Sequence, residues 1–209
     1  AKNADWKWIS ANLNKALCIF VLSQDFKNEL IRRGIKSDIH LTSTKVPDYF
    51  ISGFDLSMRQ GKAENIMYSG RIEKAKGVYE TVDTFSILKS QYKDLTLTFV
   101  GDGSELPMLK QYVENKKIKD VRFTGELRGE DFKKEYINAD MYLFLSYTEG
   151  MPTVVLEAMI FGLPIFTRKV GGLIDFFENG KMGYISSSLD PAVFAEAMKP
   201  YIENPAKMR

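Results

Sequence analysis

The strongest constraint on the fold is a series of short apolar runs, each followed by a longer stretch with helical periodicity. The runs lack the apolar–polar alternation of a half-exposed strand, which is typical of strands buried on both faces of a parallel sheet. We predict strands at residues 18–22, 38–41, 65–69, 95–100, 121–123, 141–145, 164–167 and 183–185, and helices at 77–91, 106–113, 132–137, 154–161 and 192–202. This alternation predicts an α/β fold with a Rossmann-like, doubly wound parallel sheet.

The predicted elements divide the chain into three parts. Residues 44–64 mix proline, glycine, serine and charge without a clear period, so we expect a linker there. Residues 65–209 hold six predicted strands and are expected to form a nearly complete domain. Residues 1–43 hold two strands and two helices, which is too little for a domain, so we expect the tail of a preceding one. The chain begins on AKNADWKWIS and ends on ENPAKMR within a helical pattern, so a fragment of a longer protein is expected.

Composition narrows the classes of function. The net charge is +2, so no large positive field favours nucleic acid, and no such partner is expected. Cys18 is the only cysteine and lies in the apolar run ALCIFVLS, so we expect a buried structural thiol in a reducing, cytoplasmic compartment. His40 is the only histidine, which excludes catalytic or metal sites that need a second one.

Membrane contact is a further question that the sequence raises. No apolar run is long enough to span a bilayer. Trp6 and Trp8 lie beside Lys2 and Lys7, a pattern compatible with peripheral contact at the inner face of a membrane in a full-length protein. An ordinary amphipathic helix explains the same pattern, and we favour that interpretation.

Two loops carry residues suited to a phosphorylated ligand, which in doubly wound sheets binds beyond the carboxyl ends of the strands. In MYSGRIEKAKG, Gly70 ends a strand and is followed by Arg71 and Lys76 before a helix begins. An arginine fork, a lysine and a helix N-terminus suit a diphosphate, although solvated loop charges explain these residues as well. In VGDGSE, Gly101 and Gly103 form only an incomplete dinucleotide fingerprint, and a turn that needs glycine explains them equally well.

The loop SYTEGMPTVVLEA brings two carboxylates near one strand end. Glu149 lies in the loop, Pro152 suits the first turn of a helix, and Glu157 lies about one turn into that helix. A carboxylate near a helix N-terminus has a purely structural use, because it complements the helix dipole. Both carboxylates could also accept hydrogen bonds from the adjacent hydroxyls of a sugar or ribose. A fourth loop, with Gly171 and Gly172, lies at the same predicted edge.

In this order, these residues resemble the family 4 retaining glycosyltransferases, which have the GT-B fold of two Rossmann-like domains. GRIEKAKG matches the family's G-R-x-x-x-x-K-G element, and EGMPTVVLE matches its E-x7-E signature. VGDGSE, VRFTG, ADMYLFLS and the VGG loop also fit, so the resemblance covers about residues 16–205. Asp175 stands where the family usually has Glu. The resemblance identifies residues 65–209 as the carboxyl-terminal, donor-binding domain.

The resemblance implies a role for each matching residue. Glu149, with the backbone N–H groups of Gly150 and Met151, would hold the hydroxyls of the donor sugar. Arg71 and Lys76, beside Gly70, would grip the diphosphate and stabilise charge on the leaving nucleotide. The catalytic group implied is Arg71, Lys76 and Glu149. The remaining implied donor-binding residues are Thr153 and Val154 at the phosphate, Glu157 at the ribose, and Arg122 and Phe123 near the base.

The implied reaction moves a sugar from a nucleotide-diphosphate donor, most often a uridine diphosphate sugar, to a polysaccharide, glycolipid or similar acceptor. Configuration is retained by same-face attack, and neither cofactor nor metal is implied. The family's acceptor domain has no counterpart here, so we expect this chain to bind donor and to be inactive alone.

Three alternatives stay open. The first is a non-catalytic sugar-nucleotide-binding module on the same fold. The second is a dehydrogenase, although the loop after the first strand of the predicted domain lacks the complete G-x-G-x-x-G that it would need. The third is a phosphorylase or synthase of storage glucan, although no sequence context for a pyridoxal-binding lysine is recognisable.

Overall fold

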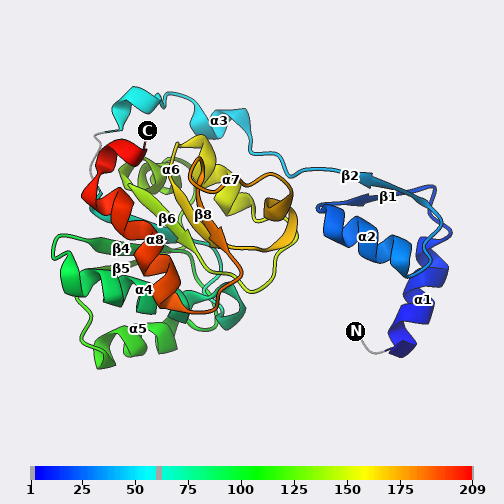
Figure 1. Cartoon of the computed structure of the whole chain (residues 1–209), viewed down its shortest axis with the longest axis horizontal. Coiled ribbons are helices and arrows are strands. Elements are labelled where there is room, and N and C mark those ends of the chain that lie inside the picture. Colours follow the sequence, from blue (N-terminus) through cyan, green and yellow to red (C-terminus); the bar gives the residue numbers. More distant parts are fainter. Residues whose placement is uncertain (1–2, 60–62, 209) are drawn as a thin grey trace.

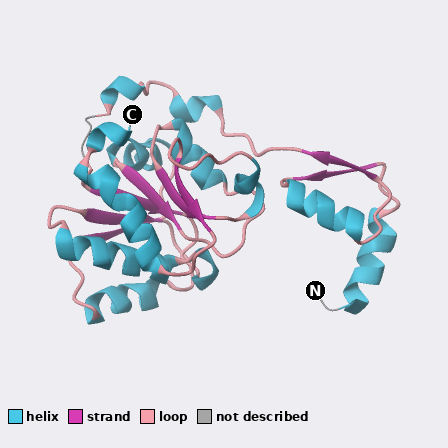
Figure 2. Ribbon diagram, viewed as in Figure 1, coloured by secondary structure: helices cyan, strands magenta, loops and turns pink. Residues whose placement is uncertain are grey.

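The computed structural model describes residues 3–59 and 63–208. It consists of an α/β domain and a smaller amino-terminal unit, which lie side by side and are joined by an extended segment (Figure 1). The ribbon coloured by secondary structure shows the strands of the larger domain between two layers of helices (Figure 2). Within the described residues, no helix is both long and apolar enough to cross a membrane.

The smaller unit contains α1 (Asn3–Leu13), β1 (Cys18–Val21), α2 (Gln24–Arg32) and β2 (Asp38–Leu41). The two strands pair in parallel, with α2 as the crossover between them. Its small core is formed by Val21, Leu30, Ile35 and Ile39. Trp6 packs against this core under the guanidinium of Arg33, whereas Trp8 is 71% exposed. Membrane contact through these tryptophans stays a prediction.

The expectation of a buried Cys18 is wrong, because Cys18 is exposed. In β1 the side chains alternate, and Ile19 and Val21 belong to the core cluster while Cys18 and Phe20 face the other way. Only one face of this two-stranded sheet is covered by helices, so an apolar run in the sequence does not imply burial of both faces here. His40 lies on β2 and is also exposed.

The larger domain has the predicted six-stranded parallel sheet. Its strands are β3 (Asn65–Ser69), β4 (Thr96–Val100), β5 (Val121–Gly125), β6 (Met141–Phe144), β7 (Ile165–Arg168) and β8 (Gly183–Ser186). The order in the sheet is β5-β4-β3-β6-β7-β8, with every pair parallel. The chain therefore builds the sheet outward from β3 to one edge and then from β6 to the other, which is the doubly wound topology.

Helices cover both faces of the sheet (Figure 1). One layer contains α4 (Val78–Gln91), α5 (Leu106–Asn115) and α8 (Pro191–Glu203), and α4 contacts both other helices. The other layer contains α6 (Gly129–Asn138) and α7 (Thr153–Ile160), with the short α3 (Asp48–Ile51) packed on α6. Short 3-10 turns complete the fold: η1 (Leu56–Met58), η2 (Lys74–Lys76), η3 (Gly171–Asp175) and η4 (Pro205–Met208). Strands β3, β4 and β6 are almost wholly buried, as their continuous apolar runs predict.

The linker is anchored to the larger domain at two points. Phe50 of α3 packs edge-on against the rings of Tyr136 and Phe161. The guanidinium of Arg59 donates to the carbonyls of Phe161 at 2.9 Å and Tyr136 at 3.0 Å, and also to those of Ile137 and Ala139. Burial lowers the pKa of Arg59 to about 10, which leaves it charged at neutral pH. Arg59 thereby satisfies carbonyls at the carboxyl ends of both α6 and α7.

Replacing Arg59 with methionine is expected to lower the free energy of unfolding by about 3 kcal/mol, because buried carbonyls lose charged donors. Urea unfolding of Arg59→Met and of the unchanged chain measures the difference. Arg128→Met is the matched control, since Arg128 is 86% exposed and pairs only with Glu126 in the described structure. Equal stability of the two variants would contradict the anchoring role.

Candidate functional site

The switch in strand order lies between β3 and β6, which are neighbours in the sheet. From β3 the chain continues into α4 on one face, and from β6 into α7 on the other (Figure 1). The helices that follow these loops therefore lie on opposite faces of the sheet, and the carboxyl edge between them, here called the crevice, is the usual ligand position in such folds. These are the loops that carry GRIEKAKG and SYTEGMP.

The loop after β3 presents two cations. Arg71 is 71% exposed at its side chain, and its Nη1 lies 2.9 Å from Glu73 Oε1. Lys76 ends η2, immediately before Gly77, where α4 begins. Gly77 has a φ of 68°, and a Cβ there would lie 2.0 Å from the carbonyl oxygen of Leu145. Glycine is therefore required where this loop packs against the end of β6.

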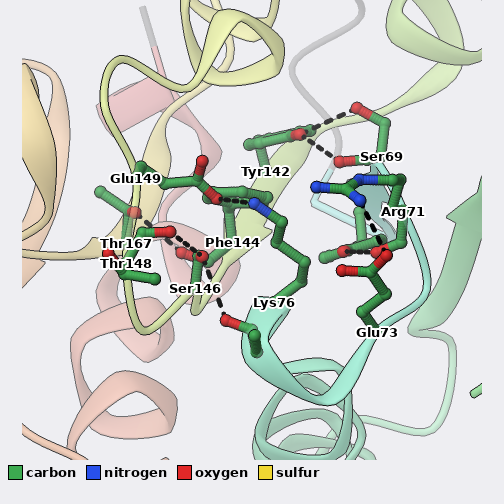
Figure 3. A network of polar contacts seen from close by, with 12 residues as sticks. Ser69, Arg71, Glu73, Lys76, Tyr142, Phe144, Ser146, Thr148, Glu149 and Thr167 are labelled. Atoms are coloured by element: carbon green, nitrogen blue, oxygen red, sulfur yellow. Dashed lines mark hydrogen bonds and ion pairs between the residues drawn. The ribbon is translucent and has the colours of Figure 1, made fainter. Parts of the chain in front are cut away.

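An ion pair joins the two loops across the crevice. Lys76 Nζ lies 2.7 Å from Glu149 Oε1, and the two side chains are only 17% and 12% exposed. Figure 3 shows this pair in one view with the Arg71–Glu73 pair. The backbone supports the same junction, because Tyr147 N donates to the carbonyl of Ala75 at 3.0 Å. Lys76 and Glu149, which are far apart in the sequence, thus form one ion pair at the carboxyl edge of the sheet.

The start of α7 offers backbone donors to the crevice. Pro152 occupies the N-cap and provides no side-chain cap. The first N–H groups of the helix, those of Thr153 and Val154, therefore have no partner inside the helix and suit an anion. Gly150 is tied in place just before them, because its carbonyl accepts from Gly172 N at 2.8 Å. Met151 is half-buried against the core.

Glu157 lies on α7, and its carboxylate accepts a hydrogen bond from the buried hydroxyl of Tyr136. Tyr136 O–H donates to Glu157 Oε2 at 2.9 Å. Burial raises the pKa of the Glu157 carboxyl above its ordinary value, and the bond from Tyr136 opposes that rise. The Tyr136 oxygen is also 2.8 Å from Ser69 Oγ, which is 2.8 Å from the Tyr142 oxygen.

A cavity of about 340 Å³ adjoins these residues at the ends of β3, β4 and β5. It is lined by Gly70, Arg71, Val100, Gly101, Asp102, Glu126, Leu127, Phe132 and Val154. Sequence reasoning missed Glu126 and Leu127. Strand β5 continues to Gly125, two residues beyond its predicted end, so the residues at its carboxyl edge are later in the chain than expected.

The structure does not bring Arg122 and Phe123 to this cavity. Arg122 lies near the start of β5, and its Nη1 donates to Glu135 Oε1 of α6 at 3.0 Å. Phe123 stacks on Phe99 with ring centroids 5.2 Å apart. Side chains within a strand point into the helix layers, so only residues at its end can line the crevice. The other predicted site residues lie on the loops after β3 and β6 or on α7.

The glycines of the VGDG turn serve close packing of loops. Gly101 has a φ of 137°, and a Cβ there would lie 2.0 Å from the carbonyl oxygen of Gly70. Gly70 N donates to Val100 O at 3.0 Å, and Ile72 N to Asp102 O at 2.8 Å. These contacts hold the first two loops of the domain together. The turn interpretation of this motif therefore accounts for its glycines.

The VGG loop packs against the Glu149 loop and the smaller unit. A Cβ on Gly171 would lie 2.2 Å from the carbonyl oxygen of Gly150, and one on Gly172 would lie 2.1 Å from that of Leu22. Asp175 Oδ2 accepts from Gln24 N at 2.8 Å, at the first turn of α2. These two glycines thus allow a close approach of protein backbone.

Two further features bear on the choice of site. Within residues 3–59 and 63–208, no group of three or more His, Cys, Asp or Glu side chains is arranged to hold a metal ion.

A larger cavity of about 740 Å³ lies at the opposite edge of the sheet, lined by Pro164 before β7 and Gly183 at the start of β8. Its lining contains no carboxylate, the acceptor on which the sugar and ribose contacts expected from the sequence depend.

Comparison with known proteins identifies the family. Residues 57–209 match the family model described as glycosyl transferases group 1. A relative named glycogen synthase, from Mycobacterium tuberculosis, is 30% identical over 149 residues, which is 71% of this chain and 36% of that protein. The chain thus spans little more than a third of this relative's length.

Solved structures show the same fold. The crystal structure of TarM, a protein of S. aureus, matches with a TM-score of 0.84 at 20% identity, covering 97% of this chain and 40% of that one. The structure of Anabaena HepE in complex with UDP and glucose matches with a TM-score of 0.80 at 19% identity, covering 100% of this chain and 60% of that one. The α/β, GT-B-type fold expected from the sequence is confirmed.

Burial of Glu157 predicts a stability that depends on pH. Because its pKa is raised in the folded state, the native chain binds this proton more tightly than the unfolded chain. Stability from this group therefore falls as pH rises from the unfolded pKa through the folded one. Glu157→Gln removes the buried charge and still accepts from Tyr136, so it is expected to raise the melting temperature at pH 7 by about 2 °C.

Calorimetric melting of both chains between pH 5 and 7 checks this expectation. The advantage of Glu157→Gln is expected to shrink on acidification, as the unchanged carboxyl takes up its proton. A variant that melts below the unchanged chain at pH 7, or a difference that does not vary with pH, would contradict it.

Proposed function

Because the chain belongs to the glycosyl transferases group 1, we propose that its larger domain binds the nucleotide-diphosphate sugar donor of a retaining sugar transfer. The observation that carries this proposal is the Lys76–Glu149 pair at the switch point, where a cation and a hydroxyl acceptor lie 2.7 Å apart. In the donor, the diphosphate and the sugar are joined through one oxygen. A donor placed at this pair therefore has a cation for its phosphate and a carboxylate acceptor for its sugar hydroxyls.

The proposed donor lies along the crevice. Its diphosphate contacts Arg71 and Lys76 and the N–H groups at the start of α7. Its sugar hydroxyls donate to Glu149 and meet the N–H groups of Gly150 and Met151. Its ribose hydroxyls donate to Glu157, beside the cavity at the ends of β3 to β5.

We place the base in that cavity near Glu126 and Leu127, in place of Arg122 and Phe123. The exposed Arg71–Glu73 pair costs little to open, so Arg71 is available to the phosphate.

The proposed chemistry follows from where charge develops. The bond between the anomeric carbon and the phosphate oxygen breaks, and negative charge accumulates on the leaving diphosphate. Arg71 and Lys76 stabilise that charge, which is the main way such a site lowers a barrier. The acceptor hydroxyl attacks from the same face and gives its proton to the leaving phosphate, so Glu149 forms no covalent bond and configuration is retained.

The proposed acceptor is a saccharide or a lipid-linked saccharide. We propose that it is bound by residues outside this chain. A more specific candidate is synthesis of a storage glucan, which the resemblance to a relative named glycogen synthase favours. A non-catalytic module would bind the same nucleotides but would leave the sugar–phosphate bond intact in a longer protein that contains an acceptor domain. Release of nucleotide by such a longer protein, given donor and glucan primer, separates these candidates.

Calorimetric titration with uridine diphosphate and its glucose conjugate tests the donor site. We expect the folded chain to bind with a dissociation constant between about 1 µM and 1 mM. Lys76→Ala and Glu157→Ala are each expected to weaken binding about tenfold, because each removes a charged hydrogen-bond partner.

Lys74→Ala is the matched control for the titration. Lys74 is an exposed lysine of the same 3-10 turn, and its loss is expected to change affinity less than about twofold. A folded chain that binds no nucleotide, or equal losses for Lys74→Ala and Lys76→Ala, would reject the proposed site.

A further inference from the structure

A chain of buried hydroxyl groups runs beneath the crevice and ends on Glu157. The oxygens of Tyr142 and Tyr136 each lie 2.8 Å from Ser69 Oγ, and Tyr136 O–H lies 2.9 Å from Glu157 Oε2. The three hydroxyl-bearing residues are fully buried, each with 0% exposure. Figure 3 shows the Tyr142–Ser69 end of this chain. The elements that contribute are β6, β3, α6 and α7, so the chain links both sides of the switch point.

The ionised carboxylate sets the direction of every hydrogen bond in the chain. A carboxylate can only accept, so Tyr136 donates to Glu157. Ser69 Oγ then donates to the Tyr136 oxygen, and the Tyr142 hydroxyl donates to Ser69, where both Oγ at 2.8 Å and the carbonyl oxygen at 3.2 Å lie within its reach. The carbonyl of Val154, at 3.3 Å from the Tyr136 oxygen, is a more distant and uncharged competitor. Aligned bonds of this kind polarise one another, so the last donor is strengthened by those behind it.

The Tyr136 ring cannot follow a moving Glu157 side chain. It stacks on Phe161 with centroids 5.4 Å apart and planes 8° apart, and Phe50 packs edge-on against it. Its hydroxyl is therefore a stationary donor, and Glu157 Oε2 is held where that donor lies. Among the described residues no group donates to Oε1, which leaves that oxygen for a ligand.

We propose that Tyr136 is a positioning residue, whose hydroxyl holds Glu157 in the one rotamer that accepts the ribose hydroxyls of the donor. This inference rests on the proposed function and goes beyond it, because Tyr136 is fully buried and acts only through Glu157. Holding the carboxylate before the ligand arrives avoids the loss of rotamer freedom on binding, so affinity improves without a new contact.

The pH dependence of nucleotide binding distinguishes a positioning role from a merely structural one, because it reports the charge of Glu157. The titratable groups that face it are Tyr136 from α6 and Tyr142 from β6, and α7 carries no other charged residue. Burial raises the pKa of Glu157 and the Tyr136 bond lowers it. Without the hydroxyl the pKa rises further, so nucleotide binding that needs the ionised form fails at a higher pH.

The central experiment compares uridine diphosphate affinity for the unchanged chain and Tyr136→Phe. The variant keeps the ring and loses only the oxygen, so the aromatic packing is retained. We expect a three- to tenfold loss of affinity at pH 7, the range of one ordinary net hydrogen bond, because the hydroxyl affects binding only through Glu157. The weakening of binding on acidification should also begin at a higher pH than in the unchanged chain.

Tyr92→Phe is the matched control, because it too removes a phenol that donates to a glutamate, Glu203, at 2.5 Å. It should leave affinity unchanged. Ser69→Ala is a second variant that interrupts the chain one bond earlier, and it should weaken binding less than Tyr136→Phe and move the pH dependence in the same direction.

A double-variant cycle decides whether Tyr136 acts through Glu157. In a Glu157→Ala background, adding Tyr136→Phe should change affinity less than twofold. The loss caused by Tyr136→Phe should also be smaller with 2′-deoxyuridine diphosphate, which lacks one ribose hydroxyl.

Two results would overturn the inference alone: unchanged affinity of Tyr136→Phe, or the same loss in the Glu157→Ala background. If the folded unchanged chain binds neither nucleotide, the proposed function falls and the inference falls with it.

Discussion

The pairing of β3 with β6 is the constraint on which the site depends. These strands are parallel, with Ile66 opposite Met141 and Met67 opposite Tyr142, yet they belong to different halves of the chain. Because α4 leaves one face and α7 the other, the loops before these helices meet at the carboxyl edge of the sheet, the usual ligand position in such folds. The Lys76–Glu149 ion pair joins these loops, and the Tyr142–Ser69–Tyr136 hydroxyls connect β6, β3 and α6 below it.

The site contains partly buried charged groups, which do not stabilise the folded state as apolar core residues do. Glu157 is buried enough for its pKa to rise, and the Lys76–Glu149 pair is mostly withdrawn from water. Charges placed this way cost desolvation energy until a ligand occupies them. Stability is supplied elsewhere, by the apolar strands and by Arg59, which ties the linker to the ends of α6 and α7. This division is typical of sites preorganised for binding.

Much of the fold and part of the site could be predicted from the sequence. Every predicted strand is present, and the continuous apolar runs of β3, β4 and β6 are buried on both faces as expected. Arg71, Lys76, Glu149 and Glu157 lie at the crevice because loops after parallel strands share one edge.

The wrong predictions share a physical cause. The exposure and direction of a side chain depend on neighbours that are distant in the sequence, and a local sequence pattern does not contain them. Cys18 is exposed because one face of its small sheet is uncovered, and Arg122 points to α6 because side chains within a strand face the helix layers. The hydroxyl of Tyr136 meets Glu157 only after α6 and α7 pack together.

The most direct test of the proposed donor site is a crystal structure of the chain with uridine diphosphate. We expect electron density in the crevice, with the diphosphate between Arg71, Lys76 and the start of α7 and the ribose hydroxyls on Glu157 Oε1. We also expect Tyr136 and Glu157 to keep the hydrogen bond seen without ligand. Density for the nucleotide in the 740 Å³ cavity at the opposite edge of the sheet, with the crevice unchanged, would contradict it.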